Sequence, residues 1–248
     1  MGAARSDTRV RLDPKSVSKP DYPTRTRIKV CGLTREHDVE TACIAGVDTI
    51  GFVLYERSPR FVAPARAAEL ARPLPAFVQP VLLFVNPTNE WFMSACRLVD
   101  SALVQFHGDE TPERCAELAK LASRRWIKAA RIPQKNGSAF DLLEFAAQYK
   151  AASAILLDTL VDGYGGSGKT FDWSLVPPSV DSHLVLSGGL TPANVGDGIR
   201  AFRSRGRSLS VDVSSGVEAS KGIKDPIAIQ RFVEAVRSAD ASLTQFPI

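Results

Sequence analysis

The chain has 248 residues, of which 44% are apolar and 23% charged, and its formal net charge is +4. This composition can bury the core of one large domain or two small ones, and it excludes a chain that is disordered throughout. No stretch is apolar over the roughly 18 residues of a membrane span, and the basic residues do not gather with aromatics into a stripe. We therefore expect neither membrane insertion nor nucleic-acid binding.

The N-terminus has no apolar block followed by a small-residue cleavage site, which predicts an unsecreted, cytoplasmic protein. The cysteines are widely spaced and form no cluster with histidine at zinc spacing, so we expect free thiols and no metal. The cysteines are Cys31, Cys43, Cys96 and Cys115.

Residues 1–26 are rich in Arg, Lys, Asp, Ser, Thr and Pro and have few large apolar side chains. Such a segment cannot bury enough surface to offset its ordering entropy. It is predicted to be a flexible extension, and residues 27–248 are predicted to form the catalytic domain.

From Arg27 onward, short β-rich runs alternate with segments of helical periodicity. The predicted strands are Ile28–Cys31, Thr49–Leu54, Pro80–Val85, Ala102–Phe106, Trp126–Ala129, Ala154–Asp158, Leu184–Ser187 and Leu209–Val213. The predicted helices are Arg35–Ala45, Ala63–Ala71, Glu90–Val99, Pro112–Ala122, Phe140–Tyr149, Pro192–Phe202 and Pro226–Val236, with a short helix near Asp172–Val176.

Eight βα units in about 220 residues favour a single-domain (β/α)8 barrel over an open doubly wound sheet. The first strand is followed by Cys31-Gly32-Leu33-Thr34 and not by the glycine fingerprint of a dinucleotide-binding fold. In such a barrel, the C-terminal ends of the strands carry the active site.

Two candidate groups for acid/base chemistry stand at strand ends. Cys31 ends the first strand, where an ionised thiol can act as a base, although a buried cysteine can also be a structural residue. Asp158 ends an apolar strand, where its carboxyl can donate a proton or can cap a neighbouring loop. The two would face a ligand from different sides of the barrel.

Glycines and serines follow the last two strands. Gly188 and Gly189 let the backbone approach a ligand closely, and Ser214 and Ser215 supply hydroxyls and amides. Together they predict the phosphate cradle of such barrels, with a helix beginning at Pro192 behind it, unless they form only tight turns.

Further polar groups follow other strands. Arg60 can pair with a carboxylate, and His107 can contact substrate or begin a turn. Residues 163–170 match the pattern of a nucleotide-binding P-loop, but they lie apart from the preceding strand and precede only a short helix. We predict that residues 162–170 form a lid over the barrel mouth.

The ordered set of motifs resembles the phosphoribosylanthranilate isomerase family of tryptophan biosynthesis, from Arg27 to about Val236. Phe106 and Ser167 depart from residues that the family often has there, and neither is a proposed catalytic group. The motifs are residues 29–34 (KVCGLT), 51–53 (GFV), 58–60 (SPR), 84–86 (FVN), 105–110 (QFHGDE), 165–173 (GGSGKTFDW), 187–190 (SGGL) and 212–218 (DVSSGVE).

The resemblance implies an Amadori rearrangement of N-(5-phosphoribosyl)anthranilate without metal or organic cofactor. Cys31 matches the general base and Asp158 the general acid. Arg60 matches the group that holds the anthranilate carboxylate. The residues His107 and Asp212 match the pocket lining, and Gly188, Gly189, Ser214 and Ser215 match the phosphate site. For a base at neutral pH, we expect the pKa of Cys31 to be depressed.

Two alternatives differ in their catalytic groups. A related isomerase of histidine biosynthesis uses two aspartates, and a non-catalytic barrel that binds phosphorylated ligands needs only the cradle. The cysteine at the first strand end favours the tryptophan enzyme. The expected partner is a small phosphorylated substrate, and the chain is expected to be a monomer or a homodimer.

Overall fold

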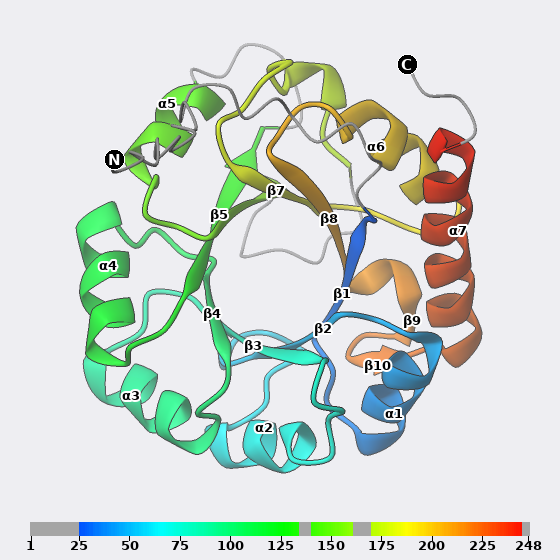
Figure 1. Cartoon of the computed structure of the whole chain (residues 1–248). Coiled ribbons are helices and arrows are strands. Elements are labelled where there is room, and N and C mark those ends of the chain that lie inside the picture. Colours follow the sequence, from blue (N-terminus) through cyan, green and yellow to red (C-terminus); the bar gives the residue numbers. More distant parts are fainter. Residues whose placement is uncertain (1–24, 134–139, 161–169, 245–248) are drawn as a thin grey trace, which may run out of the picture.

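The computed structural model describes residues 25–133, 140–160 and 170–244. Within these ranges, eight parallel strands follow one another in chain order around a closed barrel. Figure 1 looks along the barrel and shows the helices as an outer ring. The strands are β1 (Arg27–Cys31), β2 (Thr49–Val53), β3 (Gln79–Phe84), β4 (Leu103–Phe106), β5 (Trp126–Ile132), β6 (Ala154–Thr159), β7 (His183–Leu186) and β8 (Ser208–Val213).

The helices of the ring are α1 (Glu36–Ala45), α2 (Pro64–Ala71), α3 (Asn89–Leu98), α4 (Pro112–Leu121), α5 (Leu142–Gln148), α6 (Val195–Phe202) and α7 (Pro226–Thr244). Helices α1 to α6 of the ring connect successive barrel strands, and α7 follows the last one. Between β6 and β7, the described residues contain only a short 3₁₀ helix, Trp173–Leu175. The predicted (β/α)8 barrel is confirmed, and each of its eight predicted strands coincides with an observed one.

One predicted helix start is wrong. The helix expected to begin at Pro192 begins at Val195, with Asn194 as its N-cap residue. The Asn194 side chain accepts a hydrogen bond from the Thr191 amide at 2.8 Å and donates one to the Gly189 carbonyl at 3.0 Å. These two bonds stabilise a turn, so the helix begins three residues later.

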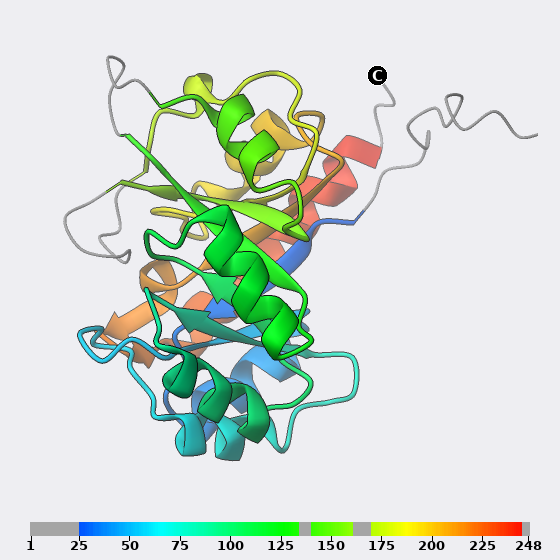
Figure 2. The same ribbon diagram turned by 90° about the vertical axis from the view of Figure 1, so that its left-hand side faces the viewer.

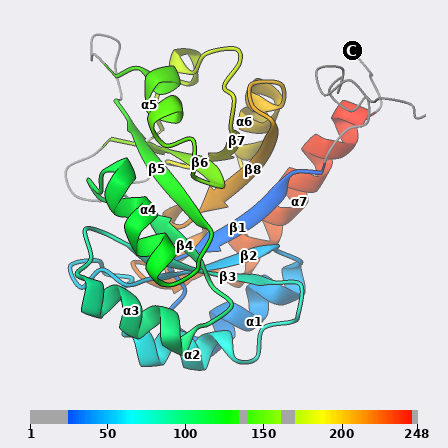
Figure 3. The ribbon, with the colours of Figure 1, turned by 60° about the vertical axis from the view of Figure 1, so that its left-hand side comes forward.

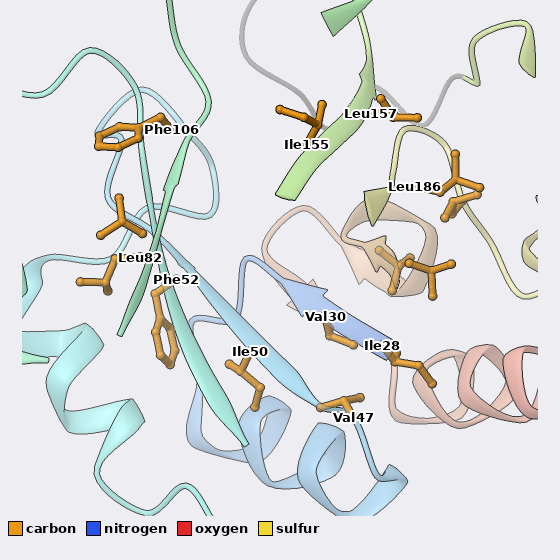
Figure 4. Packing of buried hydrophobic residues seen from close by; sticks show 14 of the residues in the cluster. Ile28, Val30, Val47, Ile50, Phe52, Leu82, Phe106, Ile155, Leu157 and Leu186 are labelled. Carbon is orange, nitrogen blue, oxygen red and sulfur yellow. The ribbon is translucent and has the colours of Figure 1, made fainter. Parts of the chain in front are cut away.

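The strands present alternate side chains to two different environments. In β1, Ile28 and Val30 belong to the main apolar core, which lies between the barrel and its helices. Figure 4 shows them with Ile50 and Phe52 of β2 on the side of the ribbon that the helices cover. The residues between them, such as Lys29 and Cys31, therefore point into the barrel.

The barrel closes where β1 pairs with β8, and this pairing sets Lys29 opposite Asp212. Helix α7 packs between α1 and α6 and runs alongside β1 (Figures 1 and 3). Its residue Asp240 accepts hydrogen bonds from the amide and the hydroxyl of Thr26, which is fully buried.

The last two residues of the predicted extension contact the barrel. Thr26 bonds to Asp240 of α7, and Arg25 pairs with Asp48, which directly precedes β2. Residues 1–24, the rest of the predicted extension, lie outside the described residues.

A small antiparallel hairpin follows β8 and consists of β9 (Glu218–Ser220) and β10 (Ile223–Lys224). Figure 2 shows it in orange beside the loops that follow β1 and β2. The Thr34 hydroxyl donates to the Gly222 carbonyl at 2.9 Å. Gly222 has φ +80°, and a Cβ there would lie 2.8 Å from the Pro59 carbonyl oxygen, so this close approach requires glycine.

Across the described ranges, no helix has both the length and the apolar composition needed to cross a membrane.

Candidate active site

The structure brings all nine predicted site residues to one hollow at the C-terminal end of the barrel. The hollow encloses about 720 Å³, including space open to solvent, which suits a small-molecule site. The predicted residues that line it are Cys31, Arg60, His107, Asp158, Gly188, Gly189, Asp212, Ser214 and Ser215.

Cys31 is the last residue of β1, and Lys29 lies on the same interior face, two residues earlier. The Lys29 ammonium donates to Asp212 at 2.9 Å, and both side chains are buried. Opposite Cys31 in the sheet is Gly51. A Cβ at Gly51 would lie 2.7 Å from the Cys31 sulfur and 3.1 Å from the Lys29 nitrogen. The absence of a side chain at this position leaves room for thiol and ammonium.

The expected depression of the Cys31 pKa is wrong for this structure. Burial raises the pKa of Cys31, because it penalises the thiolate more than the nearby Lys29 ammonium favours it. Asp212 raises this pKa further, while Lys224 lowers it. For Lys29, burial lowers the pKa, but Asp212 and Cys31 outweigh that effect and raise it, so Lys29 remains a cation.

Asp158 lies at the end of β6 and is held by two hydrogen bonds. Its Oδ1 accepts from the Thr159 amide at 2.8 Å, and its Oδ2 lies 3.0 Å from Nε2 of His107. The other ring nitrogen of His107, Nδ1, lies 2.9 Å from Nε2 of Gln105. The three polar side chains thus form a buried chain of hydrogen bonds that ends at the candidate acid.

Arg60 lies across the mouth of the barrel and is fixed by the hairpin. Its Nε and Nη2 donate to the two carboxylate oxygens of Glu218 at 2.6 and 2.7 Å. Lys224 donates to the same carboxylate at 3.0 Å. Gly32, at φ +77°, gives room for this arrangement, because a Cβ there would lie 2.5 Å from Cδ of Arg60.

The two glycines after β7 form a concave piece of backbone. Gly188 and Gly189 have φ values of +77° and +63°, in the left-handed region that favours glycine. A Cβ at Gly188 would lie 2.5 Å from the Thr159 hydroxyl oxygen. Within the described residues, the amides of Gly188 and Gly189 have no hydrogen-bond acceptor. They are therefore available to an anion.

The turn after β8 completes the concave backbone. Ser215 begins a short 3₁₀ helix, Ser215–Val217, and lines the hollow. Ser214 uses its hydroxyl within the fold, because it donates to the Cys31 carbonyl at 3.0 Å and lies 3.3 Å from the Lys224 nitrogen. The hydroxyl expected to bind a ligand thus ties the end of β8 to the end of β1.

Two further expectations concern this site. The predicted lid, residues 162–170, lies outside the described residues except for Thr170. Among the described side chains, no three of His, Cys, Asp and Glu form a group that could hold a metal ion.

Four further residues of the site were missed from the sequence: Lys29, Gln105, Glu218 and Lys224. Lys29 and Gln105 carried a usable signal, since each is a polar residue inside an apolar strand, two positions before a predicted site residue. Residues at i and i+2 of a strand share a face. Glu218 and Lys224 reach the site through the hairpin, whose position no local pattern indicates.

Fold and site together define a barrel enzyme with a thiol, a carboxyl and a backbone cradle for an anion around one hollow. Residues 28–235 match the family model described as N-(5'phosphoribosyl)anthranilate (PRA) isomerase. The chain belongs to this family, and its activity is that isomerisation in tryptophan biosynthesis.

Individual relatives agree with the family match. The chain is 55% identical over 217 residues to N-(5'-phosphoribosyl)anthranilate isomerase of Methylibium petroleiphilum, covering 88% of this chain and 96% of the relative. It is 39% identical to the solved phosphoribosyl anthranilate isomerase of Thermotoga maritima, with a TM-score of 0.75, covering 86% of this chain and 99% of that one.

Another solved relative is described as a complex with reduced 1-(o-carboxyphenylamino)-1-deoxyribulose 5-phosphate. It is 36% identical, with a TM-score of 0.72, and the match covers 86% of this chain and 99% of that one.

Proposed function

We propose that Cys31 is the general base and Asp158 the general acid of the rearrangement. The observation that carries this proposal is their placement at the ends of β1 and β6, on two walls of one hollow, with the concave backbone after β7 and β8 between them. A substrate anchored on that backbone has a thiol on one side and a carboxyl on the other.

The reaction then proceeds by four proton movements. Asp158 gives its proton to the ribose ring oxygen as the C1'–O4' bond breaks, and the anthranilate nitrogen forms a Schiff base with C1'. The Cys31 thiolate removes the C2' proton, and the electron pair of that bond forms a C1'=C2' double bond. The resulting enolamine loses its hydroxyl proton and gains one at C1'. The product, 1-(2-carboxyphenylamino)-1-deoxyribulose 5-phosphate, has the composition of the substrate, so no proton is consumed.

The two ends of the substrate fit opposite parts of the hollow. Gly188, Gly189 and Ser215 offer backbone to the phosphate. On the other side, Val53 and Leu83 form an apolar wall beside Cys31, next to Arg60, where the anthranilate ring can pack. Since Nε and Nη2 of Arg60 are held by Glu218, the Nη1 side of the guanidinium is the part that can be offered to the carboxylate.

The roles of Cys31 and Asp158 are tested by the decay of phosphoribosylanthranilate fluorescence. Cys31→Ser should reduce kcat strongly, because a hydroxyl does not ionise at neutral pH. Asp158→Asn should bind substrate but turn over at least roughly a hundredfold more slowly, the scale of general acid catalysis. Near-normal turnover of either variant would reject the corresponding role.

We further propose that the site is complete within one chain and works in the cytoplasm. All of the groups named above belong to one protomer, and the free thiols suit a reducing compartment. A solved relative is described as dimeric, with monomers derived from it. Activity should therefore be the same per chain in monomer and homodimer, which sedimentation and kinetics on the same samples can test.

A further inference from the structure

Gln105 lies inside the barrel, in β4, and belongs to the chain of hydrogen bonds that ends at the candidate acid. Its side chain is fully buried, and its Nε2 lies 2.9 Å from Nδ1 of His107. Among the described residues, its Oε1 has no hydrogen-bond partner. Buried polar groups are nearly always paired, so an amide with one unpaired end calls for an explanation.

The orientation of the Gln105 amide determines which nitrogen of His107 carries the ring proton. An amide nitrogen can only donate, so Nδ1 of the imidazole accepts, and the ring proton is on Nε2. Nε2 then donates to Oδ2 of Asp158 at 3.0 Å, so Oδ2 accepts and carries no proton. In this state, Oδ2 of the candidate acid has no proton to give to the substrate.

A second arrangement of the same side chains carries one proton more. A half-turn of the Gln105 amide places Oε1 against the imidazole, where it accepts from an Nδ1 proton. The imidazole can then hold protons on both nitrogens. The Nε2 proton can pass to Oδ2 of Asp158, because Oδ1 is already occupied by the Thr159 amide. This half-turn exchanges two atoms of similar size: it pairs Oε1 with the imidazole and moves the amide nitrogen to the position where Oε1 had no partner.

We propose that Gln105 is a positioning residue whose amide orientation sets the protonation of His107 and thereby supplies Asp158 with the proton for ring opening. The proposal rests on the acid role of Asp158 given above. The two states differ by one proton, which enters from the pocket and adds to Nδ1. Ring opening breaks the Oδ2–H bond and forms the O4'–H bond. The substrate hydroxyl later releases a proton, which replaces the one that Asp158 gave to the ring oxygen.

The charged and titratable groups around this chain come from several elements. Lys128 of β5 pairs at 2.8 Å with Glu110, which lies in the loop that follows β4. Across the hollow, Arg60 and Asp212 are each engaged in an ion pair. Cys31 is the other titratable group that a pH profile would report. A measurement on the imidazole itself is therefore needed to distinguish the titration of His107 from that of Cys31.

Nitrogen NMR of protein labelled with [¹⁵N]histidine provides that readout, since the chain has only three histidines, His37, His107 and His183. A His107→Asn variant identifies the signal. For the wild type well above neutral pH, we expect the His107 proton on Nε2. A neutral ring with its proton on Nδ1 at that pH would overturn the proposal without any Gln105 variant.

Two variants test whether Gln105 determines which nitrogen of His107 is protonated. Gln105→Met keeps the shape but neither donates nor accepts, so at a fixed high pH the Nδ1 and Nε2 forms of His107 should mix. Gln105→Glu offers only an acceptor, so a proton should stay on Nδ1 at that pH.

In kinetics, Gln105→Met should lower kcat by tenfold or more with KM within about threefold. Gln105→Glu should keep kcat high to a pH at least one unit above the wild-type limit. Circular dichroism melting checks that both variants fold.

The proposal is overturned if His107 has the same protonated nitrogen in both folded variants as in the wild type, or if the pH profile of kcat is unchanged in both. Failure of the acid role is seen separately, as near-normal turnover of Asp158→Asn. In that case, the NMR result still reports whether Gln105 controls the imidazole.

Discussion

Replacing Lys29 by Met tests what stabilises the thiolate of Cys31. Methionine fills a similar volume inside the barrel but removes the buried ammonium. The Cys31 sulfur and the Lys29 nitrogen are close together. A Cβ placed on Gly51 would lie 2.7 Å from the sulfur and 3.1 Å from the nitrogen. The change therefore removes a positive charge next to the proposed base.

The size of the effect follows from this geometry. The two atoms are at most about 6 Å apart, where Coulomb's law at an effective dielectric constant of about 20 gives roughly 2.8 kcal/mol, or about two pKa units. The pKa of Cys31 is already raised by burial, so the thiol is mostly protonated at neutral pH. A base must be deprotonated to act. Lys29→Met should therefore lower the thiolate fraction and kcat about a hundredfold near neutral pH.

The assay is the rate of Cys31 alkylation by iodoacetamide against pH, followed by mass spectrometry of the peptide that contains it. At pH values below the pKa of Cys31, the alkylation rate should rise tenfold per pH unit in the wild type and in Lys29→Met. At any such pH, the rate in Lys29→Met should be about a hundredfold lower than in the wild type. Lys29→Arg keeps the charge and should stay close to the wild type. Since Lys29→Met leaves Asp212 without its cation, the double variant with Asp212→Asn serves as a control that carries no orphaned charge.

Equal alkylation profiles for the Asp212→Asn single variant and the double variant would refute this reasoning. They would mean that the ammonium does not act on the thiol when Asp212 is neutral in both proteins. A loss of kcat with an unchanged alkylation profile would likewise place Lys29 outside the control of the base.

The remaining predictions concern the cradle, the arginine and a structural ion pair. Gly188→Ala adds a Cβ at φ +77° against a neighbouring hydroxyl. It should raise KM about tenfold and lower the free energy of unfolding by roughly 1–3 kcal/mol. An unchanged KM and an unchanged urea midpoint would contradict this. Glu218→Gln removes the charged partner of Arg60, so KM should rise more than kcat falls in steady-state kinetics. Lys128→Met leaves Glu110 buried without its cation and should cost about 3–5 kcal/mol in urea unfolding.

The sequence was sufficient for the fold because its signals there are local. A strand such as Val81–Phe84 is buried on both faces and reads as a continuous apolar run. Helix starts at Thr88 and Thr111 show the capping hydroxyl directly. The start expected at Pro192 failed because the Asn194 side chain bonds the preceding loop, which propensity does not report.

The site could be predicted where strand ends converge, since the closed barrel brings the end of every strand to one rim. That rule placed Cys31 and Asp158 correctly in one hollow. It did not give the ionisation of Cys31, because that depends on the balance between burial and the charges of Lys29 and Lys224. Such a balance is a property of the folded structure and has no counterpart in residue spacing.

The charges beside the base show why the hairpin matters for the chemistry. Three buried cations, Lys29, Arg60 and Lys224, face two buried carboxylates, Asp212 and Glu218. One positive charge is therefore left over at this side of the hollow, and a thiolate would balance it. A substrate with a carboxylate and a phosphate brings more negative charge and opposes ionisation of the thiol. The surplus cation, carried by β10, offsets part of that opposition, so the hairpin contributes to the basicity of a residue on β1.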